Sequence, residues 1–255
     1  MGLLDTLKGL VGLGSSTPPS APPAPVQNLL HIPLFDQLNP QGQAIQAPLL
    51  PSAQLAPPAA AMNPNNILTD AEFVDCSSMT EKQIQDLIAF KGSFLKDYQI
   101  NGHLPSYWVY KYCNDMGLNP KVLLTNIQKE QGTITMKTFP KNQRRLDYFA
   151  GVGAFDPPRG DDPKWKGVDN QIRGSVIVST KRFKGNQALV YPLHYTTDRP
   201  ESRQLRIENA ATMSLYNYTP FVGDQDVIIG KNKYEAPFGN AFFFVIYQRW
   251  FGFKK

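Results

Sequence analysis

Apolar side chains after residue 66 recur mostly with the helical period of about 3.6 residues. A Thr-Glu-Lys-Gln capping pattern precedes the first strongly periodic stretch, and a proline begins the second. The helices predicted from these signals begin at about residues 81, 105 and 120 and later span about residues 170–183, 208–218 and 240–250. Two stretches favour β structure instead, residues 187–207 as a small hairpin or flap and 227–230 as a short strand. The fold class predicted is mainly α, with a small β element.

The chain before residue 67 has a different composition. Three of the 47 acidic and basic residues lie within residues 1–69, whereas 12 of the 22 prolines lie within residues 1–64. Residues 15–66 cannot bury enough apolar surface to offset the entropy lost on ordering, so a proline-rich extended linker or arm is predicted there. The alternative is an arm that becomes ordered on a partner in a large assembly.

Residues 1–14 form a separate apolar element. Leucine and valine side chains follow helical spacing there, with Asp5, Thr6 and Lys8 on the opposite face. The stretch is too short to span a bilayer and lacks the features of a clear signal peptide. We therefore predict an amphipathic anchor helix that binds a membrane or a groove of a neighbouring subunit, with a passive apolar tail as the alternative. Residues 67–255 are predicted to form the main domain.

The helix predicted over residues 119–132 carries a candidate catalytic acid. Asn119 and Pro120 are typical of a helix start, and Gly132 is typical of the position just after a helix end. Glu130 lies three residues after Ile127, so the two share the apolar face. Burial and the negative end of the helix dipole both disfavour an ionised carboxylate, which suits a proton donor for glycosidic bond cleavage. The alternative is a helix-end glutamate that bends out into water.

Three segments in order resemble a known family. Asn-Pro-Lys-Val-Leu-Leu followed by Gln-Lys-Glu-Gln-Gly (119–132) is similar to the catalytic-helix motif of lysozyme-like peptidoglycan hydrolases, the lytic transglycosylase and glucosaminidase relatives. Residues 146–153 resemble the Leu-Asp-Tyr-Ala-Met-Gly segment of these enzymes, and residues 209–220 resemble their Asn-Ala-Ala-Thr-x-x-Leu-Tyr-x-Tyr-Thr-Pro segment. A closing stretch at 239–252 also fits. The resemblance covers about residues 67–253.

The resemblance implies a lysozyme-like helical domain that cleaves the β-1,4 glycan strands of peptidoglycan, with Glu130 as a single general acid/base. A hydrolase would need a second carboxylate about 5–9 Å away. The candidates for it are Asp147 and Asp156, whereas Asp161 and Asp162 are more typical of a turn, because they lie in Gly-Asp-Asp-Pro. After Gly153 the chain has Ala-Phe-Asp-Pro-Pro where relatives often carry Cys-Pro-Asp, so the cleft loop departs from the family pattern.

The resemblance also implies residues that bind the glycan. It places Tyr216, Asn217 and Tyr218 beside the cleft, where a tyrosine hydroxyl could orient the acid or contact an N-acetyl group. The alternative for Tyr216 is a core aromatic residue. Gln131, next to Glu130, either lines the cleft or faces solvent. No metal or cofactor is expected.

Other chemistries receive less support from the sequence. Two cysteines and three separated histidines contain no Cys-x-x-Cys or His-Glu-x-x-His pattern, and no phosphate-binding loop or Gly-x-Ser-x-Gly is present. We expect the two cysteines to be reduced core residues rather than a disulfide pair. The net charge of +5 arises after residue 69, with basic clusters at residues 137–145 and 181–184. Such a surface suits the anionic bacterial wall better than nucleic acid, given the Glu130 context.

The biological setting follows from the apolar tip and the arm. Together with a wall hydrolase they resemble a bacteriophage virion lysin that is built into a tail or internal membrane with other virion subunits and opens the wall during genome entry. One alternative is a secreted bacterial autolysin of the endo-β-N-acetylglucosaminidase type. Another is a structural virion or wall-binding protein with an inactive lysozyme-like fold.

Overall fold

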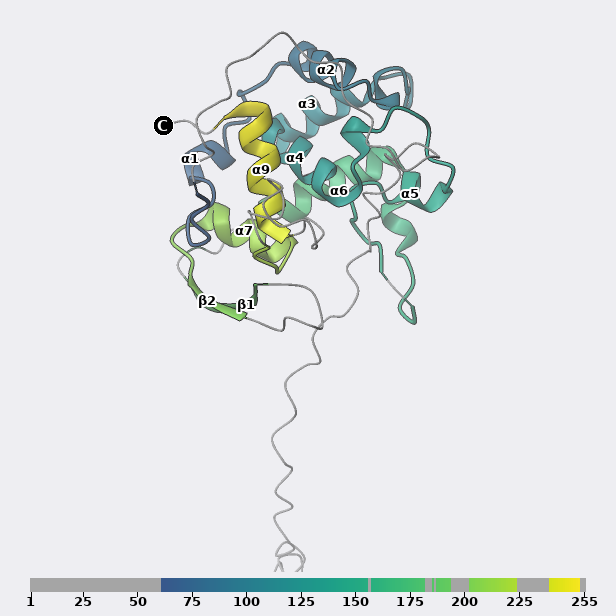
Figure 1. Ribbon diagram of the computed structural model, residues 1–255. Coiled ribbons are helices and arrows are strands. Elements are labelled where there is room, and N and C mark those ends of the chain that lie inside the picture. Colours follow the sequence, from purple (N-terminus) through teal and green to yellow (C-terminus); the bar gives the residue numbers. More distant parts are fainter. Residues whose placement is uncertain are drawn as a thin grey trace, which may run out of the picture. The chain divides into compact units, whose positions relative to one another are not determined.

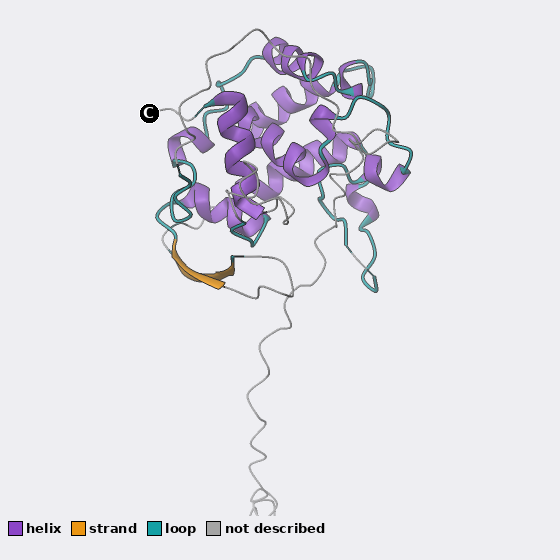
Figure 2. Ribbon diagram, viewed as in Figure 1, coloured by secondary structure: helices purple, strands orange, loops and turns teal. Residues whose placement is uncertain are grey.

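The computed structural model describes residues 61–155, 157–181, 185, 187–193, 202–223 and 239–252. Helices make up most of this part, and one small two-stranded sheet accompanies them (Figures 1 and 2). This confirms the prediction of a mainly α fold with a small β element. The predicted anchor helix at 1–14 and most of the predicted arm lie outside the described residues. In the part that is described, no helix is both long and apolar enough to cross a membrane.

The helices come first along the chain, the hairpin follows α6, and two more helices end the described part. In chain order the elements are α1 (Asp70–Phe73), α2 (Glu81–Phe90), the 3-10 helix η2 (Phe94–Lys96), α3 (Pro105–Met116), α4 (Pro120–Gln131), η3 (Thr133–Thr135), α5 (Gln143–Asp147), η4 (Pro163–Trp165), α6 (Val168–Thr180), β1 (Ala188–Pro192), β2 (Ser202–Arg206), α7 (Ala210–Tyr218) and α9 (Gly239–Phe251).

The predicted helix starts and the hairpin are found in the structure. Thr80 and Gln83 form a reciprocal capping box at α2, and Pro105 occupies the first turn of α3. Helix α7 begins two residues later than predicted, because the Asn209 side chain accepts a hydrogen bond from the Thr212 N–H and caps the helix there. Strands β1 and β2 pair antiparallel, with Ala188 opposite Arg206. The strand predicted at residues 227–230 lies outside the described residues.

Helix α4 is the central helix of the described body. It packs between α3 and α9 (Figure 1). Ten of its twelve residues are buried, so the helix is covered around most of its circumference and not only on its apolar face. The Asn119 side chain accepts from the Lys121 N–H, and Gly132 ends the helix with a φ of 67°. Both predicted caps are therefore confirmed.

The Asn119 cap also ties α4 to α1. Its Nδ2 donates to the Glu72 carbonyl oxygen at 2.7 Å, and the residue is only 1% exposed. We predict that Asn119→Ala lowers the free energy of unfolding by about 2–4 kcal/mol, because it removes a cap and leaves a buried carbonyl without its donor. Chemical denaturation measures this loss. Asn142→Ala, at the exposed cap of α5, is the matched control and should cost about 1 kcal/mol.

The segment just before residue 67 packs on α7. The Tyr216 hydroxyl donates to the Pro64 carbonyl oxygen at 3.0 Å, and the Glu208 N–H donates to the Asn65 carbonyl oxygen at 2.9 Å. Asn66 Nδ2 donates to the Glu208 carboxylate at 2.9 Å. The packed region of the chain therefore includes residues that the sequence assigned to the end of the arm.

Both cysteines are free thiols. Cys113 is fully buried on α3, and Cys76 is partly exposed. Burial raises the pKa of the Cys113 thiol well above its usual range, which keeps it protonated and unreactive. Thiolate chemistry is therefore not expected at Cys113.

Candidate active site

The last turn of α4 places Glu130 inside the protein. The residue is 9% exposed, as its position on the apolar face predicts. Its Oε1 accepts a hydrogen bond from the Thr219 hydroxyl at 3.2 Å and forms an ion pair with Lys129 Nζ at 3.0 Å. Glu130 is therefore a buried, partnered carboxylate and does not bend out into water.

Lys129 is the second charged group of the site. It is 5% exposed, and its Nζ donates to the Thr219 hydroxyl at 2.5 Å and lies 5.2 Å from the centre of the Tyr218 ring. Burial lowers the pKa of the Lys129 ammonium, and the neighbouring Glu130 carboxylate offsets only part of that effect. A cation, a carboxylate and a hydroxyl thus form one closed triangle.

The loop after α5 approaches the other oxygen of Glu130. Gly151 has a φ of 77°, and a Cβ added to it would lie 3.3 Å from Glu130 Oε2. A left-handed backbone at such a close approach favours glycine. The main chain of Gly151 therefore forms one wall around the carboxylate.

Gln171 on α6 holds this loop in place. Its Oε1 accepts from the Ala150 and Val152 N–H groups at 3.1 and 3.2 Å. Its Nε2 donates to the carbonyl oxygens of Val152 at 2.7 Å and Trp165 at 2.6 Å. Because Gln171 is fully buried and all of its amide atoms are used, the loop that carries Gly151 has a fixed distance from α6.

The segment after α7 is held by two other elements. Asn240 on α9 donates to the carbonyl oxygens of Thr219 and Phe221 at 2.9 and 3.1 Å. The Tyr218 hydroxyl donates to the Ala150 carbonyl oxygen at 2.7 Å. These bonds fix the Thr219 hydroxyl, which contacts Glu130.

The predicted glycan-binding residues have different positions. Tyr216 is 0% exposed, stacks on Tyr191 with ring centres 4.8 Å apart and has its hydroxyl bound to the main chain, so it is a core aromatic residue. Tyr218 is partly exposed and lies at Lys129, close to the acid. Asn217 is partly exposed, and Gln131 is 7% exposed with its carbonyl oxygen bound by Arg145.

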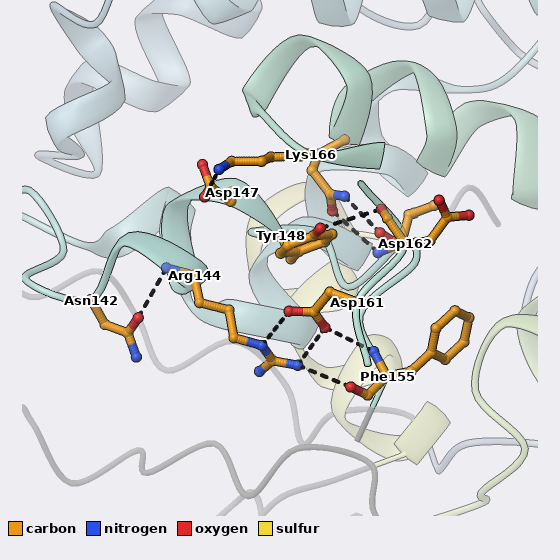
Figure 3. A network of polar contacts seen from close by, with 10 residues as sticks. Asn142, Arg144, Asp147, Tyr148, Phe155, Asp161, Asp162 and Lys166 are labelled. Carbon is orange, nitrogen blue, oxygen red and sulfur yellow. Dashed lines mark hydrogen bonds and ion pairs between the residues drawn. The ribbon is translucent and has the colours of Figure 1, made fainter. Parts of the chain in front are cut away.

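The predicted second carboxylates have other partners or lie outside the described residues. Asp147 ends α5, where Gln143 donates to its Oδ1 at 3.0 Å and Lys166 pairs with its Oδ2 at 3.3 Å. In Figure 3 its carboxylate points toward Lys166. Asp156 is not among the described residues, so the structure does not place it.

Asp161 and Asp162 shape the loop, as their turn sequence predicts. Arg144 binds Asp161 through two nitrogens, at 2.6 and 2.8 Å, and Asp161 also accepts from the Phe155 N–H (Figure 3). The hydrogen bond from Arg144 lowers the pKa of Asp161, so this carboxyl is not a proton donor near neutral pH. Asp162 caps η4 by accepting from the Lys164 N–H.

Two arginines of the basic cluster at residues 137–145 bind other groups within the domain. Arg144 binds a carboxylate and Arg145 a carbonyl oxygen, so these two residues are not solely surface charges. Among residues with a described position, no group of three or more His, Cys, Asp or Glu side chains could hold a metal ion.

A hollow of about 510 Å³ lies beside the hairpin and is lined, in the described part, by Ala188, Arg206, Ile207 and Glu208. It is at the beginning of α7, whereas Thr219 and Glu130 are at the end of that helix. The hollow and the Glu130 cluster are therefore separate features.

Sequence reasoning did not single out Lys129, Gly151, Gln171 or Thr219. Gly151 and Thr219 lie inside the segments that carry the family resemblance, so the motif contained a signal for them. No protein-family model, curated protein or solved structure matches this chain. The function of the site is therefore inferred from its geometry and its motifs.

Proposed function

We propose that this protein cleaves the β-1,4 glycan strands of bacterial peptidoglycan, with Glu130 as the single general acid/base. The observation that carries the proposal is that the three motif segments meet at one carboxylate. The three segments that resemble lysozyme-like peptidoglycan hydrolases supply Glu130, Gly151 and Thr219, and the last two both lie against the carboxylate of the first. The fourth stretch supplies Asn240, which holds Thr219.

Because these segments meet at the Glu130 carboxylate, we favour a role for them in the reaction over a role in packing alone. Segments far apart in the chain meet at one acid at the end of a central helix, and a buried acid with a fixed environment is typical of a catalytic proton donor. In the proposed reaction Glu130 protonates the leaving glycosidic oxygen. The 6-hydroxyl of the muramic acid sugar attacks the anomeric carbon, and the Glu130 carboxylate takes the proton of that hydroxyl.

The single-acid reaction fits the position of Asp147 better than hydrolysis through a second carboxylate. Lys166 and Gln143 each contact one oxygen of Asp147, and no contact with Glu130 or its partners is found for this carboxylate among the described residues. We therefore favour a lytic transglycosylase over a muramidase or glucosaminidase. Tyr218 and Gln131 are the proposed glycan contacts, since both adjoin the acid.

The proposed setting is a bacteriophage virion. There the enzyme would act on the wall, with residues 1–14 bound to other virion subunits or to a membrane. The setting rests on the apolar tip and the proline-rich arm of the sequence. A secreted bacterial autolysin of the endo-β-N-acetylglucosaminidase type is the alternative setting.

A second candidate function is a wall-binding or structural protein with an inactive lysozyme-like fold. The observation that favours it is the ion pair of Glu130, since a buried carboxylate with a cation 3.0 Å away can also be purely structural. The two candidates differ in whether the protein releases products from peptidoglycan.

Mass spectrometry of muropeptides tests the proposal. The full chain is incubated with purified peptidoglycan, and we expect released fragments with 1,6-anhydromuramic acid ends. Reducing muramic acid or reducing glucosamine ends would replace the transglycosylase by a hydrolase. No released fragments, from a folded protein that still binds the wall, would contradict the enzyme and support the binding protein.

A further inference from the structure

A cluster of aromatic and basic side chains lies where the ends of three helices meet. It consists of Phe90 and Lys91 at the end of α2, Lys121 at the start of α4, and Trp250 and Phe251 at the end of α9. We name this cluster the basic aromatic patch. We propose that the patch binds the surface of an anionic lipid bilayer, with its rings in the interfacial layer and its lysines at the lipid phosphates. This inference does not depend on the reaction proposed for Glu130.

The side chains of the patch contact one another across the three helices. Lys91 Nζ lies 4.7 Å from the centre of the Trp250 ring and 5.7 Å from that of Phe90. The rings of Trp250 and Phe251 meet edge to face, with centres 6.0 Å apart, and Lys121 Nζ lies 5.7 Å from the centre of the Phe251 ring. The five residues therefore form one continuous feature of the domain.

The patch presents apolar surface to water. Phe90 is 72% exposed, more than the other exposed large hydrophobic side chains of the described part of the chain. Trp250 and Phe251 beside it are partly exposed. Removing such rings from water is favourable, and tryptophan and phenylalanine are typical of the apolar side of interfacial membrane-binding surfaces. The rings thus supply the apolar part of a bilayer contact.

The charges of the patch favour an anionic partner. Among the residues that the structure describes, no carboxylate pairs with Lys91 or Lys121, whose ammonium groups lie over rings instead. The sequence at residues 249–255 has three basic and three aromatic residues and no acid, although residues 253–255 lie outside the described part. Lysines near an anionic bilayer are attracted to its surface potential.

The arrangement of the lysines favours a lipid surface over a sugar or a nucleobase. Flat ligands of those two kinds stack on an open face of an aromatic ring. In the patch, lysine ammonium groups lie over Trp250 and Phe251, and Tyr247 meets the Phe251 ring edge to face, with centres 5.5 Å apart. In a bilayer, by contrast, a lysine extends beside a buried ring and keeps its charge at the level of the phosphates.

The patch and the candidate active site lie at opposite ends of α4. Lys121 is in the first turn and Glu130 in the last, about 14 Å apart along the helix at 1.5 Å per residue. Helix α9 runs in the opposite direction, because Asn240 at its start holds Thr219 beside Glu130 and Phe251 at its end lies under Lys121. A bilayer on the patch would therefore not cover the acid.

Vesicle flotation of the full chain is the first test. The protein carries Leu7→Asp, which places a charge on the apolar face predicted for residues 1–14 and so weakens any binding by that stretch. We expect it to bind mixed vesicles of phosphatidylcholine and phosphatidylglycerol, and to bind vesicles of phosphatidylcholine alone far more weakly. No binding to the mixed vesicles, or equal binding to both kinds, would overturn the proposal.

Substitutions within the patch test its residues one at a time in the same Leu7→Asp chain. Phe90→Ser should lower the partition coefficient for the mixed vesicles roughly tenfold, since a ring that leaves water is lost. Lys91→Gln should lower it roughly fivefold, since one charge near the anionic surface is lost. Phe90 is mostly exposed, so the fold should be retained, which circular dichroism checks. An unchanged partition coefficient in both variants would contradict a role of the patch.

Each variant has a matched control elsewhere on the domain. Phe139→Ser removes another exposed phenylalanine, which is 49% exposed. Lys164→Gln removes another lysine that lies over a tryptophan, with its Nζ 5.1 Å from the centre of the Trp165 ring. Both controls should keep the parental partition coefficient. Losses as large as those of the patch variants would show that binding is not local to the patch, and would overturn the proposal.

Lipid-free peptidoglycan tests the competing partner. The Phe90→Ser protein should bind it as well as the parent does, because the patch is assigned to lipid. A Phe90→Ser protein that loses binding to peptidoglycan, while its binding to the mixed vesicles is unchanged, would assign the patch to the wall and overturn the proposal.

A final measurement places the lipid at the patch without altering a patch residue. The three tryptophans of the full chain are labelled as 5-fluorotryptophan, and the 19F signal of Trp250 is identified by its absence in Trp250→Phe. With small phosphatidylcholine and phosphatidylglycerol bicelles that carry a nitroxide lipid, we expect the Trp250 signal to broaden more than that of Trp165. A Trp250 signal that the nitroxide leaves unchanged in the bound protein would overturn the proposal.

Discussion

The Glu130→Gln protein is expected to lose peptidoglycan cleavage by at least ~100-fold while it keeps its fold. Glutamine has the shape of glutamate and can still accept a hydrogen bond from Thr219, so the packing is retained, although Lys129 loses its ion-pair partner and the protein should be less stable. It cannot supply a proton to the leaving oxygen. Turbidity loss of a purified wall suspension measures the rate, and circular dichroism with thermal unfolding measures the fold.

The matched control for this variant is Glu72→Gln. Glu72 is 6% exposed and accepts a hydrogen bond from the Tyr247 hydroxyl at 2.7 Å, so it is another buried glutamate in a polar contact. It is not in the Glu130 cluster, and Glu72→Gln should keep nearly the parental rate. If the Glu130→Gln protein clears peptidoglycan as fast as the Glu72→Gln protein, Glu130 is not the general acid/base of the reaction.

The second large effect is expected for Gly151→Ala. The new methyl group would lie 3.3 Å from Glu130 Oε2, which is closer than most such contacts, so the carboxylate or the loop must move. A shift of about 1 Å at a reacting group can cost up to about 100-fold in rate. We expect kcat to fall by roughly 10–100-fold, with a smaller change in KM.

Gly102→Ala separates this effect from backbone strain. Gly102 has a φ of 79°, close to that of Gly151, but no atom lies within 4 Å of a Cβ built on it. Both variants should lose roughly 1–2 kcal/mol of stability from the left-handed backbone. Equal activity in the two variants would show that the approach of Gly151 to Glu130 has no catalytic consequence.

Much of the helical architecture could be predicted, because its signals are local. Asn119, Pro120 and Gly132 mark the ends of α4 correctly, since a cap acts on the helix ends next to it. The position of Glu130 relative to Ile127 agrees with its burial, but ten of the twelve residues of α4 are buried, so that position alone does not account for it. The hairpin could be predicted from composition, whereas its register could not, because register depends on pairing across a long loop.

The partners of Glu130 could not be predicted from periodicity. Neighbouring residues on a helix point about 100° apart, so Lys129 and Glu130 are not expected to meet. They meet because both side chains extend from the last turn to the same hydroxyl, which belongs to Thr219, 89 residues after Glu130. Such a contact depends on the tertiary packing of α7 and α4.

Gln171 and Tyr216 illustrate two further limits. Gln171 lies in the apolar stretch of α6 and has no local signal that distinguishes it from a surface glutamine, yet it makes four hydrogen bonds to main-chain groups. Tyr216 lies in a motif segment, but its side chain packs in the core. A motif gives the order of residues in the chain, whereas packing decides which of them a ligand can reach.

The attachment of residues 64–66 to α7 has a mechanical consequence. A tether that pulled on the chain before residue 62 would load the domain first through Pro64, Asn65 and Asn66, whose partners are Tyr216 and Glu208. From Glu208 the load would pass along the nine residues of α7 toward Thr219 and Glu130, whereas Tyr216 already lies near the end of that helix, three residues before Thr219. Tension on the residues before Pro64 would thus reach the contact between Thr219 and Glu130 through one helix, and under the proposed function it would act on the catalytic acid.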